Sequence, residues 1–102
     1  MAGEPPRPDP STGTSPVCRN VVLRLEEGLH VRPCSLIAKV ASEATTPVTL
    51  QSGDVGADAS SMFDLIAMGL EVGSEIAICG DSAAQPAIDA IADLFETNFG
   101  DE

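Results

Sequence analysis

The stretch Gly28-Leu29-His30-Val31-Arg32-Pro33 is the part of the sequence that best indicates how the chain folds. Proline is tolerated in the first turn of a helix, so Pro33 predicts that a helix begins at about Val31. The glycine predicts a turn just before that helix. His30 is then expected at the helix N-terminus, where unpaired backbone N–H groups and the positive end of the helix dipole attract an anion.

Hydrophobic periodicity on both sides of this stretch predicts the neighbouring elements. Before it, Val21, Leu23 and Leu25 alternate with other residues, as expected of a strand with one buried face. After it, apolar residues recur at helical spacing as far as about Ala44. Further strands are expected later in the chain, the first two of them joined by a hairpin turn: 48–50, 55–58 and 75–79.

Two serines are predicted to begin the remaining helices. Ser61 precedes an apolar run and has Asp64 three residues later, which is the pattern of a helix N-cap. Ser82 and Gln85, also three residues apart, predict a capping box ahead of a second amphipathic helix. The resulting order, β-α-β-β-α-β-α, predicts an α+β domain whose helices cover one face of a mostly antiparallel sheet.

Length and composition predict one small cytoplasmic domain. The chain has 102 residues, and residues 1–16 are so rich in Pro, Gly, Ser and Thr that we expect a disordered leader, with a folded domain over 17–102. No apolar stretch is long enough to cross a bilayer, and the N-terminus lacks the pattern of a signal peptide. We therefore expect no membrane partner.

The charges are distributed unevenly along the chain. A net charge of −11 argues against nucleic acid as a partner, because nucleic-acid binding depends on clustered Lys and Arg. All five basic residues lie within the first 39 positions, whereas positions 40–102 contain twelve acidic residues. Arg32 and Lys39 therefore belong to a small positive region beside His30, suited to a phosphate and to acidic groups of a partner.

The three cysteines, Cys18, Cys34 and Cys79, are expected to be reduced and mostly buried, because an odd and widely spaced set does not resemble a disulfide framework. Cys34 lies about one helical turn after His30. These two side chains supply only two metal ligands, and no CxxC or second histidine completes a zinc site, so we expect neither a metal nor another cofactor. An exposed Cys34 would make the site redox-sensitive.

The chemistry available to His30 is phosphoryl transfer. Imidazole accepts a phosphoryl group at neutral pH because one ring nitrogen is unprotonated there. A helix N-terminus positions the group, neutralises its charge and disfavours imidazolium, and this role is expected of the first helical residues, Val31, Pro33 and Cys34. Arg32 can offer the phosphoryl oxygens two parallel hydrogen bonds.

Two stretches resemble one known family. Gly28-Leu29-His30-Val31-Arg32-Pro33 is similar to the Gly-Leu-His-x-Arg-Pro signature of HPr, the histidine phosphocarrier of the bacterial phosphoenolpyruvate-dependent sugar phosphotransferase system. The segment from Ala59 to Leu65, followed by Met68-Gly69-Leu70, resembles the second segment of that family, in which a serine heads a short helix. The resemblance covers roughly residues 17–99. It implies an open-faced sandwich, a four-stranded antiparallel sheet with three helices on one face.

The resemblance also implies a role for individual residues. His30 would accept a phosphoryl group on Nδ1 from phospho-enzyme I and donate it to an enzyme IIA domain, with Arg32 stabilising the phosphate in transit. Ser61 matches the serine that HPr kinase/phosphorylase modifies in members that have this control. The remaining matches fall on the partner-docking surface of the family: Lys39, Met62 and Phe63. Core packing is the alternative role for Met62 and Phe63.

The sequence departs from the family pattern around the second segment. Asp64 stands where relatives often carry Lys or Gly, and Ser60 stands where Lys is frequent, which weakens the positive rim of the docking face. Two adjacent serines also leave open whether Ser60 or Ser61 is the modified residue.

The leading interpretation is a monomeric phosphocarrier that is not itself an enzyme. The first alternative is a regulatory protein of the same fold, of the nitrogen-type or catabolite-control branch, that acts mainly through partner binding and phosphorylation of Ser61. The second alternative is a plain interaction module in which His30 is only a helix cap.

Overall fold

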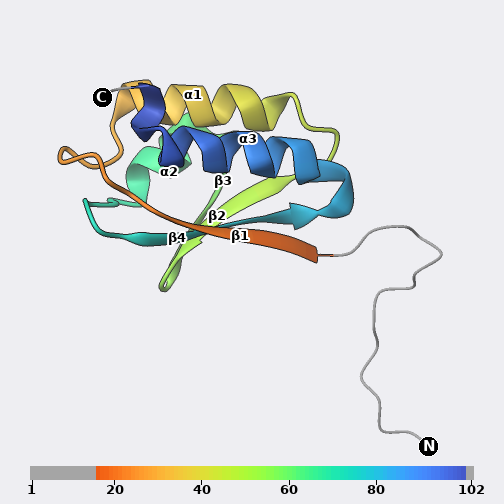
Figure 1. The fold of residues 1–102 in the computed structure, drawn as a ribbon, viewed down its shortest axis with the longest axis horizontal. Helices are drawn as coiled ribbons and strands as arrows, with labels where there is room; N and C mark the ends of the chain where they lie inside the picture. Colours follow the sequence, from red (N-terminus) through yellow and green to blue (C-terminus); the bar gives the residue numbers. More distant parts are fainter. Residues whose placement is uncertain (1–15, 101–102) are drawn as a thin grey trace, which may run out of the picture.

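The computed structural model describes residues 16–100 and shows three α-helices packed on one side of a four-stranded sheet (Figure 1). The elements are β1 (Pro16–Val22), α1 (Val31–Ser42), β2 (Val48–Ser52), β3 (Val55–Asp58), α2 (Met62–Ala67), β4 (Glu75–Asp81) and α3 (Gln85–Glu96). Short 3-10 turns, η2 (Ser82–Ala84) and η3 (Asn98–Gly100), precede and follow α3. This arrangement confirms the predicted element order and the open-faced sandwich.

The sheet has the strand order β1-β4-β2-β3, and each neighbouring pair is antiparallel. Because side chains alternate between the two faces of a strand, one set in each strand faces the helices. Val21 in β1, Ile76 and Ile78 in β4 and Leu50 in β2 are buried on that side. The opposite face of the sheet carries no helix (Figure 1).

The helices bury one stripe each against this face. The stripe of α1 contains the adjacent pair Pro33 and Cys34 and then Ile37 and Ala41, which recur three or four residues later as an amphipathic helix requires. In α3 the buried residues are Ala87, Ile88, Ile91, Ala92 and Phe95. Since most of these side chains are aliphatic, packing of Val, Leu, Ile and Ala fills most of the core.

The connection from β1 to α1 is buried, although it is not a strand. Leu23 and Leu25 are buried as the alternation predicts, but the strand ends at Val22, so its predicted extension through Leu25 is wrong. Beyond Val22 the chain pairs with the segment before β4. The Leu23 N–H donates to the Ser74 carbonyl over 2.9 Å, and the Gly73 N–H donates to the Leu23 carbonyl over 2.8 Å.

Gly28 fixes the last turn before α1. Its φ of +77° lies in the left-handed region that side chains with a Cβ rarely adopt. A Cβ at this position would lie 2.5 Å from the Leu70 carbonyl oxygen, so the backbone of Leu70 leaves no room for a side chain. The next N–H, that of Leu29, donates to this same carbonyl over 3.4 Å. The turn that leads to His30 therefore depends on glycine.

The predicted capping box of Ser82 and Gln85 is wrong. The chain first makes the 3-10 turn η2, which the Asp81 carboxylate caps by accepting from the Ala83 N–H over 3.0 Å. Helix α3 then begins with Ala84 as its N-cap and without a side-chain cap. Pro86 lies in the first turn of α3, where its missing N–H is tolerated.

The prediction of three reduced cysteines is also wrong, because Cys18 and Cys79 form a disulfide. These residues are direct partners in the antiparallel β1–β4 pair, with their Cα atoms 4.1 Å apart. Cys18 is exposed, and both side chains project from the face without helices, since the residues next to them in each strand point the other way. The bond joins the edge strand β1 covalently to the sheet.

The predicted leader, residues 1–16, lies outside the described residues except for Pro16, which is already the first residue of β1. Between residues 16 and 100 no helix has the length and apolar character needed to span a bilayer.

Candidate functional site

His30 is the N-cap of α1, as the sequence predicts. Its backbone is extended, with φ −125° and ψ −164°, and its side chain makes no capping hydrogen bond. The imidazole is 45% exposed, and its Nε2 lies 3.2 Å from Glu27 Oε1. Nδ1 has no hydrogen-bond partner within residues 16–100. The ring therefore presents one unpartnered nitrogen to solvent at the mouth of a helix.

The backbone beside this nitrogen offers two free donors. The N–H groups of Val31 and Arg32 have no hydrogen-bond partner within residues 16–100, as expected for the first turn of a helix. Pro33 has no N–H, and the Cys34 N–H donates to the His30 carbonyl over 3.0 Å as the first bond of α1. The expectation that the Cys34 backbone would hold a phosphate is therefore wrong, because that N–H is already used.

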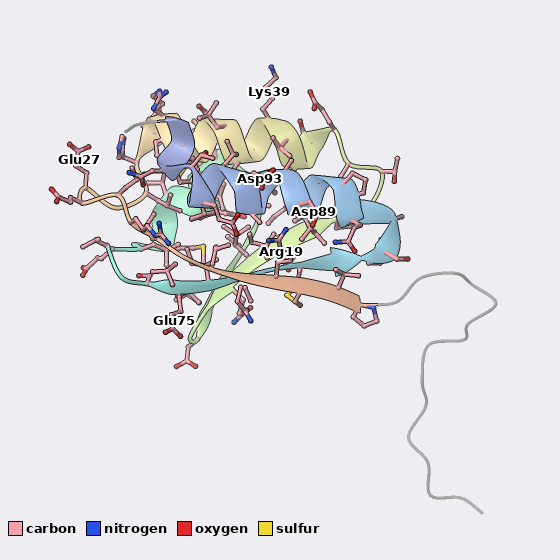
Figure 2. All side chains as sticks on the ribbon, viewed as in Figure 1. Arg19, Glu27, Lys39, Glu75, Asp89 and Asp93 are labelled. Carbon is pink, nitrogen blue, oxygen red and sulfur yellow. A yellow bond between two sulfur atoms is a disulfide. The ribbon has the colours of Figure 1, made fainter. Side chains whose placement is uncertain are left out.

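Arg32 and Lys39, the two basic residues of α1, are both exposed. Neither side chain has an ion pair within residues 16–100. Lys39 lies in the last turn of the helix and projects away from the sheet (Figure 2). Arg32 is only two residues from the imidazole, so its guanidinium is available to an anion bound there.

Cys34 does not contribute a reactive group to the site. Its side chain is fully buried, and desolvation by this burial raises the pKa of the thiol to about 11. A buried thiol with so high a pKa is protonated at neutral pH and unreactive. The redox sensitivity that an exposed Cys34 would bring is therefore absent from this position.

Glu27 is a site residue that the sequence did not reveal, since Glu26-Glu27-Gly28 predicts only a turn. The turn at Gly28 brings the Glu27 carboxylate back toward the imidazole three residues later. An acidic residue three positions before a histidine and next to a glycine is a signal that could have indicated this contact.

The two serines of the segment from Ala59 to Leu65 make different hydrogen bonds. Ser61 is the N-cap of α2, as predicted, and its Oγ accepts from the Asp64 N–H over 3.3 Å. Ser60 is exposed, and its N–H and hydroxyl both donate to Asp58 Oδ1, over 2.9 Å and 2.8 Å. These two hydrogen bonds, the backbone one first, lower the pKa of Asp58.

Two large apolar side chains are exposed at the starts of adjacent helices. Phe63 in α2 is 78% exposed and Val31 in α1 is 61% exposed. Met62 is half-buried against the core, and Leu65 is fully buried. Helices α1 and α2 are in contact, and each exposes one large apolar side chain in its first turn, Val31 and Phe63.

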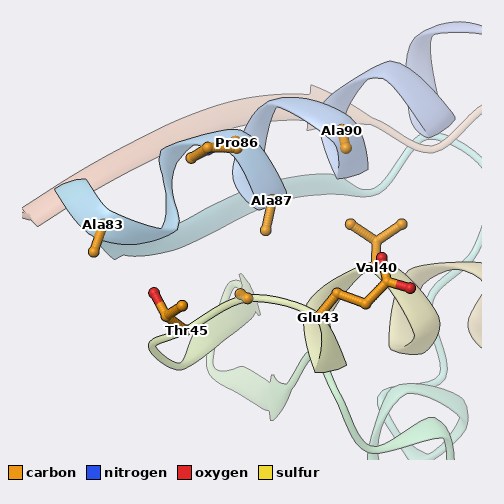
Figure 3. Close-up of a pocket in the computed structure, with 8 residues that line it drawn as sticks. Val40, Glu43, Thr45, Ala83, Pro86, Ala87 and Ala90 are labelled. Atoms are coloured by element: carbon orange, nitrogen blue, oxygen red, sulfur yellow. The ribbon is translucent and has the colours of Figure 1, made fainter.

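A cavity of about 340 Å³ between α1 and α3 is separate from this site (Figure 3). It is lined by Val40, Glu43 and Thr45 from the end of α1 and the loop after it, and by Pro86, Ala87 and Ala90 from the start of α3. His30 stands at the opposite end of α1, about 15 Å away along the helix. Residues 16–100 contain no group of three or more His, Cys, Asp or Glu placed to hold a metal ion.

Comparison with known proteins places this geometry in a family. Residues 17–97 match the family model described as the PTS HPr component phosphorylation site. The chain is 33% identical over 78 residues to the phosphocarrier protein HPr of Streptomyces coelicolor, which covers 74% of this chain and 84% of that protein.

A larger protein and a solved structure are similar as well. The chain is 33% identical over 81 residues, 78% of its length, to the phosphoryl donor subunit DhaM of a phosphoenolpyruvate-dependent dihydroxyacetone kinase of Providencia stuartii, but it spans only 17% of that subunit. The structure of a histidine-containing phosphocarrier protein of Mycoplasma superposes with a TM-score of 0.74 at 28% identity, covering 81% of this chain and 97% of the other.

The observed fold and the family match therefore both agree with the resemblance of the motif around His30. Proteins of this family carry a phosphoryl group and are not enzymes. The chain belongs to the HPr family of phosphocarrier proteins of the phosphotransferase system.

Proposed function

We propose that His30 accepts a phosphoryl group on Nδ1 from phospho-enzyme I and passes it to an enzyme IIA domain. The observation that carries this proposal is the position of the imidazole, which is half-exposed at the N-cap of α1 beside the unpartnered N–H groups of Val31 and Arg32. Those donors and the helix dipole stabilise the negative charge of a phosphoryl group on Nδ1. The Arg32 guanidinium adds a charge-assisted hydrogen bond.

Partner docking is assigned to the surface around the imidazole. Val31 and Phe63 supply exposed apolar area, and Met62, next to Phe63 in the chain, packs partly buried against the core. Lys39 and Arg32 supply positive charge that suits acidic residues on a partner. In this proposal the protein is a monomer in the cytoplasm that meets its partners transiently through this surface.

Ser61 is assigned as the site of regulatory phosphorylation by HPr kinase/phosphorylase. It is the N-cap of α2, two residues before the exposed Phe63, so a phosphate there would change partner docking. Ser60 is held by Asp58 through its hydroxyl, and Asp58 and Asp64 would both repel a phosphate nearby. Labelling with ATP and the kinase tests this: Ser61→Ala should abolish the label, and loss only in Ser60→Ala would move the site by one residue.

The test of the carrier function is phosphorylation by phosphoenolpyruvate and enzyme I, followed by transfer to an enzyme IIA domain. We expect an acid-labile phosphate that is absent from His30→Ala and formed more slowly by Arg32→Ala. A label that persists in His30→Ala would refute the assignment. No label in the wild type, together with kinase-dependent label on Ser61, would favour the regulatory alternative.

A further inference from the structure

The contact between Glu27 and His30 distinguishes the two nitrogens of the imidazole. Nε2 lies 3.2 Å from Glu27 Oε1, whereas Nδ1 has no partner within residues 16–100. Glu27 lies at the end of the β1–α1 connection, next to the start of α1 (Figure 2). Since a carboxylate can accept a hydrogen bond but cannot donate one, this contact favours a proton on Nε2.

From this geometry we propose that Glu27 is a positioning residue for phosphoryl transfer. Its carboxylate holds the Nε2–H tautomer and the orientation of the ring, so that the lone pair of Nδ1 points outward beside the free N–H groups of Val31 and Arg32. This inference rests on the proposed function, in which Nδ1 is the nucleophile. A carboxylate that orients a histidine by accepting from its other nitrogen is a general device of nucleophilic sites.

The same contact serves both directions of transfer. On acceptance, the Nδ1 lone pair forms the N–P bond while the donor's N–P bond breaks and its electron pair stays on the donor imidazole. The proton on Nε2 does not move, and the phosphorylated ring carries a positive charge that the Glu27 carboxylate stabilises. On donation, the electron pair of the N–P bond returns to Nδ1, and the ring leaves as a neutral imidazole because Nε2 keeps its proton. Without that proton the leaving group would be the more basic imidazolate.

The neighbouring acid provides a matched control. Glu26 is exposed, carries the same charge and has no side-chain hydrogen bond or ion pair within residues 16–100. Replacing Glu26 therefore changes the local charge without touching the ring. Comparison of the variants Glu27→Ala and Glu26→Ala separates the specific contact from the general effect of an acidic residue near the site.

The first measurement is nitrogen-15 NMR of the imidazole, which is unambiguous because the chain has a single histidine. We expect the wild type to show an unprotonated Nδ1 and a visible Nε2–H cross-peak, because the nearby carboxylate favours a proton on Nε2. In Glu27→Ala the cross-peak should be lost and the Nδ1 resonance should move toward a mixture of tautomers. Glu27→Gln, whose amide oxygen also accepts, and Glu26→Ala should keep the wild-type spectrum.

The second measurement is the rate of transfer from phospho-enzyme I to His30 and from His30 to an enzyme IIA domain. Loss of the carboxylate contact beside Nε2 predicts that Glu27→Ala slows both steps about tenfold. Glu27→Gln should recover most of that rate, and Glu26→Ala should stay within about twofold of the wild type. If Glu27→Ala keeps the wild-type spectrum and the wild-type transfer rates, the positioning role of Glu27 is refuted. The carrier function is tested separately, by the loss of phosphorylation in His30→Ala.

Discussion

Removal of the Cys18–Cys79 bond is the perturbation whose effect on stability the structure determines best. The two residues are 61 positions apart, so the bond closes most of the folded domain into one loop. In the chain-entropy model, a loop of that length corresponds to roughly 4 kcal/mol of stabilisation at 25 °C, because the cross-link restricts the unfolded chain. For a domain of this size, that difference corresponds to a decrease in Tm of roughly 15–30 °C.

The folded structure without the bond should remain intact. In the β1–β4 pair, the strands keep their hydrogen bonds, and Arg19 in β1 still pairs with Asp89 of α3 over 3.1 Å (Figure 2). Arg19 also keeps its pair with Glu96 of α3, over 3.3 Å. These pairs are partly exposed and contribute little by themselves, but they hold β1 against the helix layer. The double variant Cys18→Ser/Cys79→Ser is therefore expected to fold, with lower stability.

The assay is urea denaturation followed by far-ultraviolet circular dichroism, since the chain has no Trp or Tyr to serve as a fluorescent probe. The wild type should lose stability when a dithiol reductant is added, whereas the double variant should be insensitive to the reductant. Equal midpoints for the wild type with and without the reductant would refute the reasoning. So would alkylation of Cys18 and Cys79 in the oxidised, folded wild type.

Three further outcomes follow from other residues. Gly28→Ala combines positive-φ strain with a clash against the Leu70 carbonyl, and it should lower the unfolding free energy by about 3 kcal/mol. The control Gly53→Ala, whose Cβ would meet no atom within 4 Å, should lower it by about 1 kcal/mol. Similar urea midpoints for the two variants would contradict the role of the close contact at Gly28. Because burial raises the pKa of Cys34 to about 11 from 9.0, the unfolded thiol ionises first, so stability should fall as pH rises from 9 to 11. Urea titrations across that range should show a slope that Cys34→Ala lacks, and an unchanged slope in this variant would exclude the thiol as its cause. Phe63→Ser should change the unfolding free energy by less than about 0.5 kcal/mol, yet raise about tenfold the KM of enzyme I for this protein as its substrate. An unchanged KM would show that Phe63 is not part of the docking surface.

The local features of this chain could be predicted because they depend on neighbouring residues. The turn at Gly28, the start of α1 at Val31 and the N-cap at Ser61 follow from the conformational preferences of a few adjacent positions. Alternation of apolar residues predicted the strands in the same way, but it continues past Val22, where β1 ends, and so predicted too long a strand there. Leu23 and Leu25 are buried by a connection that pairs with the segment before β4, and periodicity alone does not distinguish such a connection from a strand.

The features that were missed depend on the tertiary arrangement. Cys18 and Cys79 become partners only because β4 is inserted between β1 and β2, a strand order that spacing along the chain does not reveal. The start of α3 was misplaced because Asp81 caps a 3-10 turn before it, while Ser82 and Gln85 have the spacing of a capping box. At the candidate site, the motif identified His30 and Arg32, but the contact with Glu27 required the geometry of the turn.

The proline in the first turn of α1 has a consequence for how firmly the domain can hold its cargo. A phosphoryl group has three terminal oxygens, but with Pro33 lacking an N–H the first turn has only two free amides, those of Val31 and Arg32. Even if each amide covers one oxygen, no backbone donor remains for the third, which is left to the exposed Arg32 side chain or to a partner. A receiving protein can bind that oxygen before the group has left. Incomplete coverage also keeps the loaded form from becoming too stable, so the proline favours release over storage.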